Sequence, residues 1–343
     1  MNIAVLCGGI SAERDVSMAS GSQVALALRE RGHNVVLIDV FFGYPGDYAN
    51  PAEIFSRNEA IAPHSVSDTE PDLESIRVSR IQANNSLIGD NVLEICRAAD
   101  ITFLALHGDM GENGKLQATF DIMGIPYTGS GQIGSALSMN KMLSKLIFEN
   151  SGIKTPSGIT IYKGNTPYEN VGFPCVVKPC SGGSSVGTSI VSDEAGFSAA
   201  LEFAFAYDDA VVVEQYIKGR ELSVGVLGGK AMPVIELIPD EGFYDYKNKY
   251  QGSTQEICPA DIGDAATERV QRLSERVHAA LMIDCYSRID IIMDEAGEAY
   301  VLEANTLPGM TPFSLVPQMG AAMGMSLGEL CEKIIEISLE KYK

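Results

Sequence analysis

The sequence lacks the cysteine and histidine patterns that build disulfide frameworks or zinc sites. Its seven cysteines are scattered, form no C-x-x-C pair and are odd in number, so we expect reduced, structural thiols. The four histidines contain no H-x-x-x-H pair, and a zinc hydrolase of the common kind is therefore not supported.

Long apolar runs are also missing. None reaches the ~18 residues that a membrane-spanning helix needs, and Met1 leads directly into the strand-like segment 3–6 rather than into a basic leader. With 45% hydrophobic residues and a mean hydropathy of +0.07, the composition is ordinary for a globular protein. We expect a cytoplasmic protein.

Positive charge is scarce, since 25 lysines and arginines face 45 acidic residues and the formal net charge is -20. This charge opposes long-range attraction to polyanions, so neither nucleic acid nor an anionic membrane is an expected partner. Anionic small-molecule ligands must instead be held by local lysines.

The length of 343 residues predicts two or three lobes. Apolar runs at 2–6, 35–40 and 101–106 resemble buried parallel strands, with helices predicted at 13–31 and 91–99. This alternation predicts an α/β fold whose first lobe, residues 1–107, is Rossmann-like. Its strand ends carry Gly8-Gly9 and His107-Gly108, at the edge where ligands bind in open α/β sheets. Residues 41–90 show weak periodicity and are assigned to an insertion or long connection.

Two further lobes are predicted from the later segments. The central lobe, residues 108–213, has predicted helices at 135–151 and 193–207 and predicted strands at 158–162, 174–178 and 210–214. The third lobe, residues 214–343, has a hairpin predicted at 221–227 and 231–237, a helix at 264–281 and a second hairpin at 286–293 and 299–305. His278 reads as a packed or surface histidine, and Ser326 with Glu329 predicts a capping box.

The second hairpin carries three oxygen-bearing side chains. Side chains alternate along a strand, so Glu303 and Asn305 share a face, and a turn through Gly297 brings Asp290 roughly opposite Glu303. Mg²⁺ prefers such oxygens and completes its coordination with water and substrate phosphates. The pattern indicates nucleotide phosphate chemistry, while a surface hairpin with solvated acidic residues stays open as the alternative.

A glycine- and serine-rich loop follows Lys178 and runs to residue 187. Its backbone N–H groups and hydroxyls can donate to phosphate oxygens while the lysine adds a charge, which predicts a lid over polyphosphate rather than a simple turn. A Walker A pattern is absent from the sequence. A G-x-G-x-x-G pattern at 129–134 lacks the preceding strand and the later acidic residue of a dinucleotide site, so we discount NAD.

Together these motifs resemble the ATP-grasp ligases and, within them, the D-alanine:D-alanine ligase family, over almost the whole chain. The matching blocks, in the family's order, are residues 8–17, 106–108, 111–114, 127–131, 135–141, 178–187, 244–250, 288–290, 303–311 and 314–315. Cys180 and Gly182 fill variable loop positions, and residues 41–90 match nothing in the family pattern.

The resemblance implies an ATP-grasp fold and an ATP-dependent ligase that joins two D-alanines through an acyl phosphate, for peptidoglycan precursor synthesis. The family is typically dimeric, which implies a homodimer. The implied nucleotide-binding residues are Lys141, Lys178, Ser185 and Lys249 at the phosphates, Glu214, Gln215 and Ile217 at the adenine, and Glu221 at the ribose. Asp290, Glu303 and Asn305 would bind two Mg²⁺ ions, for which Mn²⁺ is a substitute.

The same resemblance implies the amino-acid sites. Glu13, in a hydrogen-bonded set with Ser184 and Tyr250, would meet the ammonium of the first D-alanine, and Arg288 would stabilise the transferring phosphoryl group. The second D-alanine would bind at Gly309, Ser314 and Leu315, with His107 as a further substrate-site candidate. Taken alone, Glu13 is a first-turn carboxylate favoured by the helix dipole, and His107 is a residue that hydrogen-bonds the backbone.

Three alternatives stay open. The second substrate could be D-serine, whose extra hydroxyl is poorly rejected by a small pocket, or D-lactate, which the loop 244–250 disfavours. The chain could be a nucleotide- or amino-acid-binding module without catalysis, although Arg288 and the three metal ligands argue against this. The third alternative is a Rossmann oxidoreductase.

Overall fold

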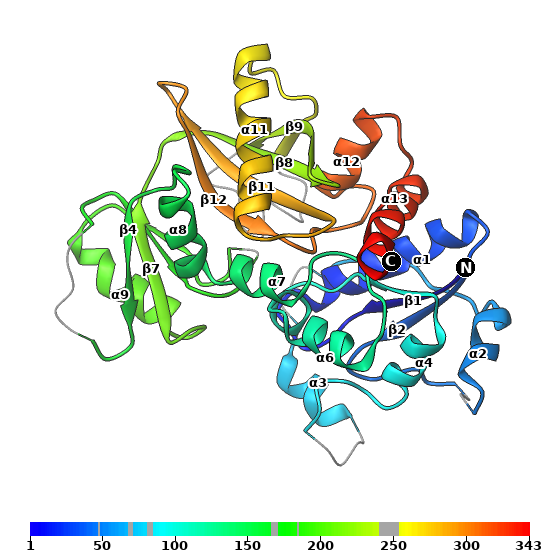
Figure 1. The fold of residues 1–343 in the computed structure, drawn as a ribbon. Helices are drawn as coiled ribbons and strands as arrows, with labels where there is room; N and C mark the ends of the chain where they lie inside the picture. Colours follow the sequence, from blue (N-terminus) through cyan, green and yellow to red (C-terminus); the bar gives the residue numbers. More distant parts are fainter. Residues whose placement is uncertain (47–48, 68–70, 81–84, 166–170, 184, 240–253) are drawn as a thin grey trace.

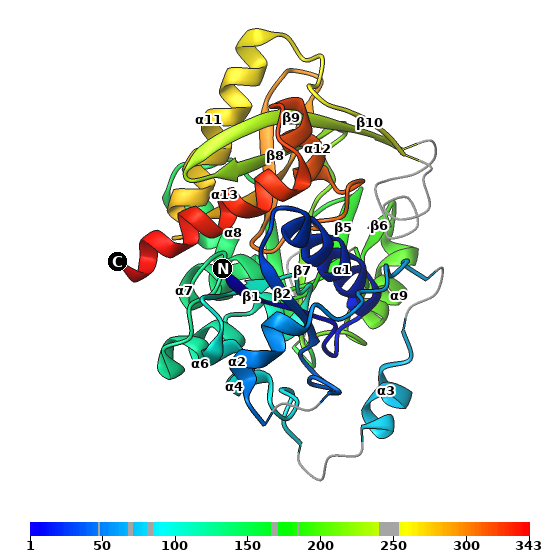
Figure 2. The same ribbon diagram turned by 90° about the vertical axis from the view of Figure 1, so that its right-hand side faces the viewer.

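The computed structural model describes residues 1–343 except 47–48, 68–70, 81–84, 166–170, 184 and 240–253. Three of the predicted site residues, Ser184, Lys249 and Tyr250, therefore lie outside the described residues, as does the rest of the block 244–250. The described chain forms three sheets, with helices packed on each of them (Figures 1 and 2).

The first sheet is parallel and has the strand order β2-β1-β3. It consists of β1 (Asn2–Cys7), β2 (Asn34–Asp39) and β3 (Ile101–Leu104), with α1 (Arg14–Glu30) joining the first two. Strand β1 pairs with both neighbours because its apolar run is buried on both faces, as is usual in parallel sheets. The predicted Rossmann-like alternation is confirmed, although β3 ends two residues before the predicted strand end.

The long connection after β2 contains short helices. They are α2 (Pro51–Ile54), η1 (Phe55–Arg57) and α3 (Leu73–Ser79), followed by α4 (Val92–Ala98) before β3. Ile54 and Phe55 are each 2% exposed and belong to the core of the first sheet. These two side chains anchor the connection to the lobe that it interrupts.

Four helices follow β3: α5 (Asp109–Glu112), α6 (Lys115–Met123), α7 (Gln132–Met139) and α8 (Lys141–Asn150). The prediction of a single helix at 135–151 is wrong. Two helices, α7 and α8, are separated by Asn140, whose φ of -92 and ψ of 102 are not helical. The Asn140 side chain accepts a hydrogen bond from Leu143 N at 3.0 Å and so caps the start of α8. At this break Lys141 N donates to Cys180 O at 2.9 Å, which attaches α8 to the glycine loop.

The second sheet is antiparallel, with the order β4-β7-β5-β6. Its strands are β4 (Gly158–Tyr162), β5 (Cys175–Pro179), β6 (Ser189–Val191) and β7 (Ala210–Gln215). Helix α9 (Glu194–Ala204) packs Phe197 and Leu201 into the core of this sheet. The glycine loop connects β5 to β6, as the sequence predicts for a loop that ends in another strand.

The third sheet is also antiparallel, with the order β10-β9-β8-β11-β12. Its strands are β8 (Gly219–Leu227), β9 (Lys230–Pro239), β10 (Thr254–Ile257), β11 (Tyr286–Asp294) and β12 (Ala299–Asn305), and α11 (Asp264–Ala280) packs on it (Figure 1). Strands β11 and β12 form the second predicted hairpin. Their register pairs Asp290 with Glu303 and Arg288 with Asn305, which confirms the predicted juxtaposition.

The C-terminal helices return to the first lobe. Helix α12 (Leu315–Ala322) leads to α13 (Leu327–Leu339), which packs against α1 and is followed by η2 (Glu340–Tyr342). The predicted capping box is confirmed, since Ser326 Oγ accepts from Glu329 N at 3.3 Å and the Glu329 carboxylate accepts from Ser326 N at 2.9 Å. Among the helices in the described ranges, none is both long and apolar enough to cross a membrane.

Candidate active site

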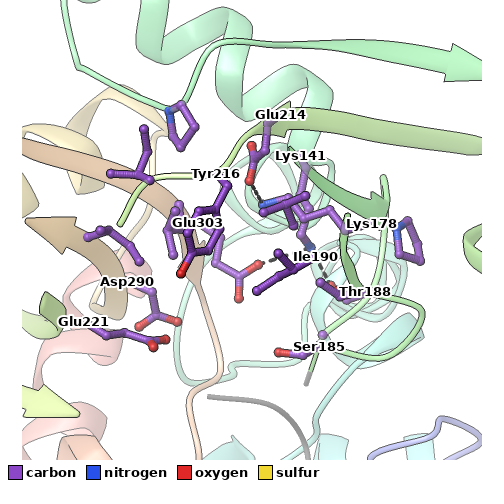
Figure 3. A pocket seen from close by; sticks show the side chains of 18 of the residues that line it. Lys141, Lys178, Ser185, Thr188, Ile190, Glu214, Tyr216, Glu221, Asp290 and Glu303 are labelled. Carbon is purple, nitrogen blue, oxygen red and sulfur yellow. Dashed lines mark hydrogen bonds and ion pairs between the residues drawn. The ribbon is translucent and has the colours of Figure 1, made fainter. Parts of the chain in front are cut away.

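A cavity of about 150 Å³ lies between the second and third sheets (Figure 3). Val176 and Ile190 from the second sheet and Leu237 and Ile292 from the third provide apolar walls. Seven predicted nucleotide-binding residues line it, namely Lys141, Lys178, Ser185, Glu214, Gln215, Ile217 and Glu221. A slot with apolar walls and polar groups at its ends suits a purine base with a polyphosphate tail.

One carboxylate holds two lysines at this cavity. Glu214 is 2% exposed, pairs with Lys178, and accepts from Lys145 Nζ at 2.7 Å. Burial raises the pKa of Glu214, but the charges of Lys178 and Lys145 outweigh burial and hold this pKa below its ordinary value. Glu214 is therefore ionised. Lys145 was not predicted from the sequence, where its spacing of four residues from Lys141 on a helix was the available signal.

Lys141 connects the glycine loop to the hairpin β11–β12. Its Nζ donates to Gly182 O at 2.8 Å and lies 3.2 Å from Glu303 Oε2. Burial lowers the pKa of Lys141, but the charge and hydrogen bond of Glu303, together with Cys180 and Glu214, outweigh burial, and the net shift is upward. Lys141 is therefore a buried, charged group that faces the cavity.

The glycine loop passes between Glu13 and the cavity of about 150 Å³, which we call the nucleotide cavity after the residues predicted to line it. Gly182, Gly183 and Ser185 line the cavity. The backbone of Gly182 has φ +120, a conformation that residues other than glycine rarely adopt. A β-carbon at Gly183 would lie 2.7 Å from Glu13 Oε2, so the backbone approaches this carboxylate as only glycine allows. The loop can therefore contact groups on both sides.

The hairpin β11–β12 brings the three predicted metal ligands together. Asp290 accepts from Arg288 Nε at 2.8 Å and Nη2 at 2.7 Å, and also from Ser223. Asn305 Nδ2 donates to Asp290 Oδ2 at 3.0 Å, and Glu303 faces Lys141. Within the described part of the chain no three His, Cys, Asp or Glu residues form a metal site. The donors here are two carboxylates and one amide, an all-oxygen set that fits a hard divalent cation.

A larger cavity of about 630 Å³ lies beside the first sheet, and we call it the amino-acid cavity after the residues predicted to line it. The predicted amino-acid site residues line it: Glu13, His107, Arg288, Gly309, Ser314 and Leu315. Asn305 and Glu303 line it as well, and Glu303 also lines the nucleotide cavity. The structure thus gathers all the predicted site residues that it describes into two adjoining cavities that share Glu303.

His107 is buried and holds backbone at the edge of the amino-acid cavity. Its Nδ1 donates to Leu307 O at 2.8 Å, which leaves Nε2, 2.9 Å from Ser20 Oγ, to accept from that hydroxyl. Burial lowers the pKa of His107 more than the neighbouring Glu13 raises it, so the ring is neutral. His107 therefore hydrogen-bonds the backbone, as expected if its role is structural, and it also lines the cavity, as expected of a substrate-site residue.

Glu112 is a second buried group here, and the sequence did not single it out. Its Oε2 accepts from Gly108 N at 2.7 Å and its Oε1 accepts from Leu307 N at 3.2 Å. Burial, and then the charge of Glu13, raise the pKa of Glu112 to about 7, against the opposing effects of these N–H groups and Arg288. The one signal in the sequence is its place in the block Gly111–Gly114.

The far end of the larger cavity is built by the segment before α12. Ser314 Oγ accepts from Thr311 N at 3.1 Å, and a β-carbon at Gly309 would lie 2.7 Å from Ser314 Oγ. Leu315 is the first residue of α12, where backbone N–H groups have no acceptor within the helix. Gln318, also not predicted, donates to Phe313 O at 2.8 Å and to the Glu256 carboxylate. A hydroxyl and a helix start together suit a carboxylate.

Comparison with known proteins agrees with this geometry. The family models for the D-ala D-ala ligase N-terminus and C-terminus match residues 2–130 and 160–336. The D-alanine--D-alanine ligase of Pediococcus pentosaceus is 44% identical over 343 residues, covering 98% of this chain and 97% of that protein. That of Citrifermentans bemidjiense is 39% identical over 335 residues, covering 97% and 95%.

A solved structure agrees over the same length. The crystal structure of D-alanine--D-alanine ligase from Bacillus anthracis complexed with ATP superposes with a TM-score of 0.74 at 31% identity, covering 99% of this chain and 98% of that one. The three sheets and the cavity between two of them define an ATP-grasp enzyme. The chain belongs to the D-alanine:D-alanine ligase family. The predicted family and fold are confirmed, and the alternative of a Rossmann oxidoreductase is set aside.

Proposed function

We propose that this protein is an ATP-dependent ligase that forms D-alanyl-D-alanine from two D-alanines for peptidoglycan precursor synthesis. The observation that carries the proposal is the adjoining pair of cavities with Glu303 in both walls. One cavity suits a nucleotide and the other holds groups that match the charges of amino acids. Relatives named D-alanine--D-alanine ligase, aligned over nearly the whole chain, support the substrate assignment.

The reaction has two transfers. A carboxylate oxygen of the first D-alanine attacks the γ-phosphorus of ATP, which breaks the bond to the β-phosphate oxygen and gives an acyl phosphate and ADP. The amine of the second D-alanine then attacks the acyl carbon, loses a proton, and expels inorganic phosphate as the peptide bond forms. Both steps depend mainly on positioning and on stabilising negative charge.

We propose that Lys141 and Lys178 bind the phosphates of ATP and neutralise their negative charge. Both side chains line the nucleotide cavity, and each is held in place by an ion pair with a carboxylate, Lys141 with Glu303 and Lys178 with Glu214. The backbone N–H groups of Gly182 and Gly183 add donors without adding bulk. Glu214 thus acts on the nucleotide through the lysines that it holds, while Gln215, Ile217 and Glu221 line the remaining wall.

Asp290, Glu303 and Asn305 would hold Mg²⁺, or Mn²⁺ in its place. When bound, the divalent ions would neutralise phosphate charge and fix the direction of the γ-phosphoryl group. Arg288, which forks onto Asp290 through two hydrogen bonds, is held rigidly at the wall of the amino-acid cavity. We assign it to the charge that develops on the transferring phosphoryl group and on the tetrahedral carbon.

In the amino-acid cavity we assign Glu13 to the ammonium of the first D-alanine. Gly108 and Gly183 both approach the Glu13 carboxylate closely, so it is fixed between the first sheet and the glycine loop. Ser314 Oγ and Leu315 N–H are assigned to the carboxylate of the second D-alanine, at the start of α12. Ser184, Lys249 and Tyr250 keep the roles that the resemblance implies for them.

We further propose the three lobes 1–107, 108–213 and 214–343, a cytoplasmic location and a homodimer. Multi-angle light scattering on the purified protein measures the dimer directly. A mass of one chain at micromolar concentration would count against the dimer and leave the ligase assignment intact.

The test is turnover with defined substrates. ATP hydrolysis is followed with D-alanine, D-serine, D-lactate and L-alanine, offered singly and in pairs, and product masses are read directly. We expect D-alanine alone to support ATP hydrolysis and to yield D-alanyl-D-alanine. Arg288→Ala should abolish turnover, while Arg272→Ala, at an exposed pair with Glu268, should not change it. Hydrolysis without a dipeptide, or only a mixed product, would refute the proposal.

A further inference from the structure

A closed set of hydrogen bonds holds residues 307–310 onto the first lobe. Leu307 is held at both backbone groups, because its N–H donates to Glu112 at 3.2 Å and its carbonyl accepts from His107 at 2.8 Å. Met310 N donates to Ser20 Oγ at 3.2 Å, and this hydroxyl in turn donates to His107 Nε2 at 2.9 Å. Three side chains of the first 112 residues thus fix a segment of the third sheet's lobe.

This segment builds the acceptor end of the amino-acid cavity. It begins two residues after Asn305 and contains Gly309, whose close approach to Ser314 Oγ leaves no room for a β-carbon. A shift of Leu307 would therefore be passed to Gly309 and Ser314. A displacement of about 1 Å at a substrate-positioning group is enough to change rates strongly.

Glu112 is the one member of the set that accepts two backbone N–H groups. It reaches back over the turn of α5 to Gly108, and across the lobe boundary to Leu307. A carboxylate has only acceptors, so it satisfies both donors at once, whereas an amide of the same shape presents a donor to one of them. A buried N–H group that loses its acceptor is costly, and the backbone would move to avoid this.

We propose that Glu112 is a positioning residue for the attacking amino acid, which it controls through Leu307 and Gly309. The inference rests on the proposed function, since it concerns the second substrate of the same reaction. Glu112 acts by holding backbone, and the contacts with the second D-alanine are made by Ser314 and Leu315. The charged and titratable neighbours of Glu112 are Glu13 from the first lobe and Arg288 and Tyr286 from β11, and His107 holds the carbonyl of the same Leu307.

The test is Glu112→Gln in the full-length protein. Initial rates over a wide range of D-alanine concentration give separate KM values for the first and second sites. We expect the KM of the second site to rise about tenfold or more, because one buried donor loses its acceptor. The KM of the first site should change by less than about twofold. Ser326→Ala, which removes the remote capping box of α13, is the control for lost stability and should change neither KM.

A second variant covers the case in which Glu112→Gln fails to fold. Ser20→Ala removes the acceptor of Met310 N while leaving the Glu112 carboxylate in place, and it should raise the same second-site KM. Unchanged second-site KM values in the folded variants, or equal rises at both sites, would overturn the inference. Wild-type protein that shows no turnover with D-alanine would instead refute the proposed ligase function, so the two failures are distinct.

Discussion

Replacing Glu214 by glutamine tests the electrostatic frame of the nucleotide cavity. Glu214 is 2% exposed and its carboxylate is shared by Lys178 and Lys145. Glutamine keeps the shape of the side chain but removes the charge. Two buried ammonium groups then face each other without their common partner, and Lys178 loses the ion pair that holds it at the cavity.

The size of the effect follows from burial. Removing one partner of a buried pair typically costs about 3–5 kcal/mol of unfolding free energy. Lys145 keeps acceptors at Thr155 Oγ1, 3.0 Å away, and Pro156 O, 2.6 Å away, so part of its interaction survives. We therefore expect a loss near the lower end, about 3 kcal/mol.

The assay is urea unfolding followed by circular dichroism at 222 nm, at neutral pH. The matched control is Glu298→Gln, which breaks the Lys154–Glu298 pair of 3.0 Å with side chains 49% and 59% exposed. An exposed pair contributes about 0–1 kcal/mol, so this variant should unfold almost as the wild type does. If the two variants lose the same small amount, Glu214 does not hold a buried charge cluster and the reasoning is refuted.

Three further predictions concern the metal hairpin, a buried histidine and Glu112. Asp290→Asn and Glu303→Gln should each cut turnover about 100-fold or more with an unchanged circular dichroism spectrum, and near-normal activity in either would contradict the metal assignment. Burial lowers the pKa of His278 to about 4, so the unfolded chain takes up a proton first as the pH falls. Stability should drop between pH 6.5 and 4 by up to about 3 kcal/mol, and this drop should be absent in His278→Gln; equal pH slopes for the two proteins would count against it. Because the pKa of Glu112 is raised to about 7, its carboxylate loses an acceptor as the pH falls through this value. The second-site KM should rise below about pH 7 in the wild type and not in Glu112→Gln. If the second-site KM changes with pH in the same way in both proteins, Glu112 is not the group responsible.

Much of the fold was predictable because it depends on local pattern. The buried parallel strands read as apolar runs, and the hairpin register followed from alternation and from the turn at Gly297. The break at Asn140 was missed because apolar spacing continues from α7 into α8. The break is made by the Asn140 side chain, which caps the start of α8, together with a hydrogen bond from Lys141 N to Cys180 O, 39 positions further along the chain.

The residues missed at the site have roles that only folding creates. Lys145 looked like one lysine on an amphipathic helix, and its partner Glu214 is 69 positions away. Glu112 and Ser20 act on backbone groups of residues 307 and 310, and no side-chain pattern encodes such partners. The metal ligands and the Lys178 loop were predicted from strand alternation and motif chemistry, and the other site residues from a family resemblance. Such a resemblance supplies groups that contact ligands more readily than groups that hold them in place.

The shared wall at Glu303 has a consequence for inhibitor design. A single compound that extends from the nucleotide slot into the amino-acid cavity must pass this carboxylate and the Lys141 ammonium beside it. Such a bridging compound should present an N–H donor to Glu303 and an acceptor to Lys141 at the passage. On the roles proposed for Glu303 and Lys141, a substitution at either position that removes the drug contact should also reduce turnover.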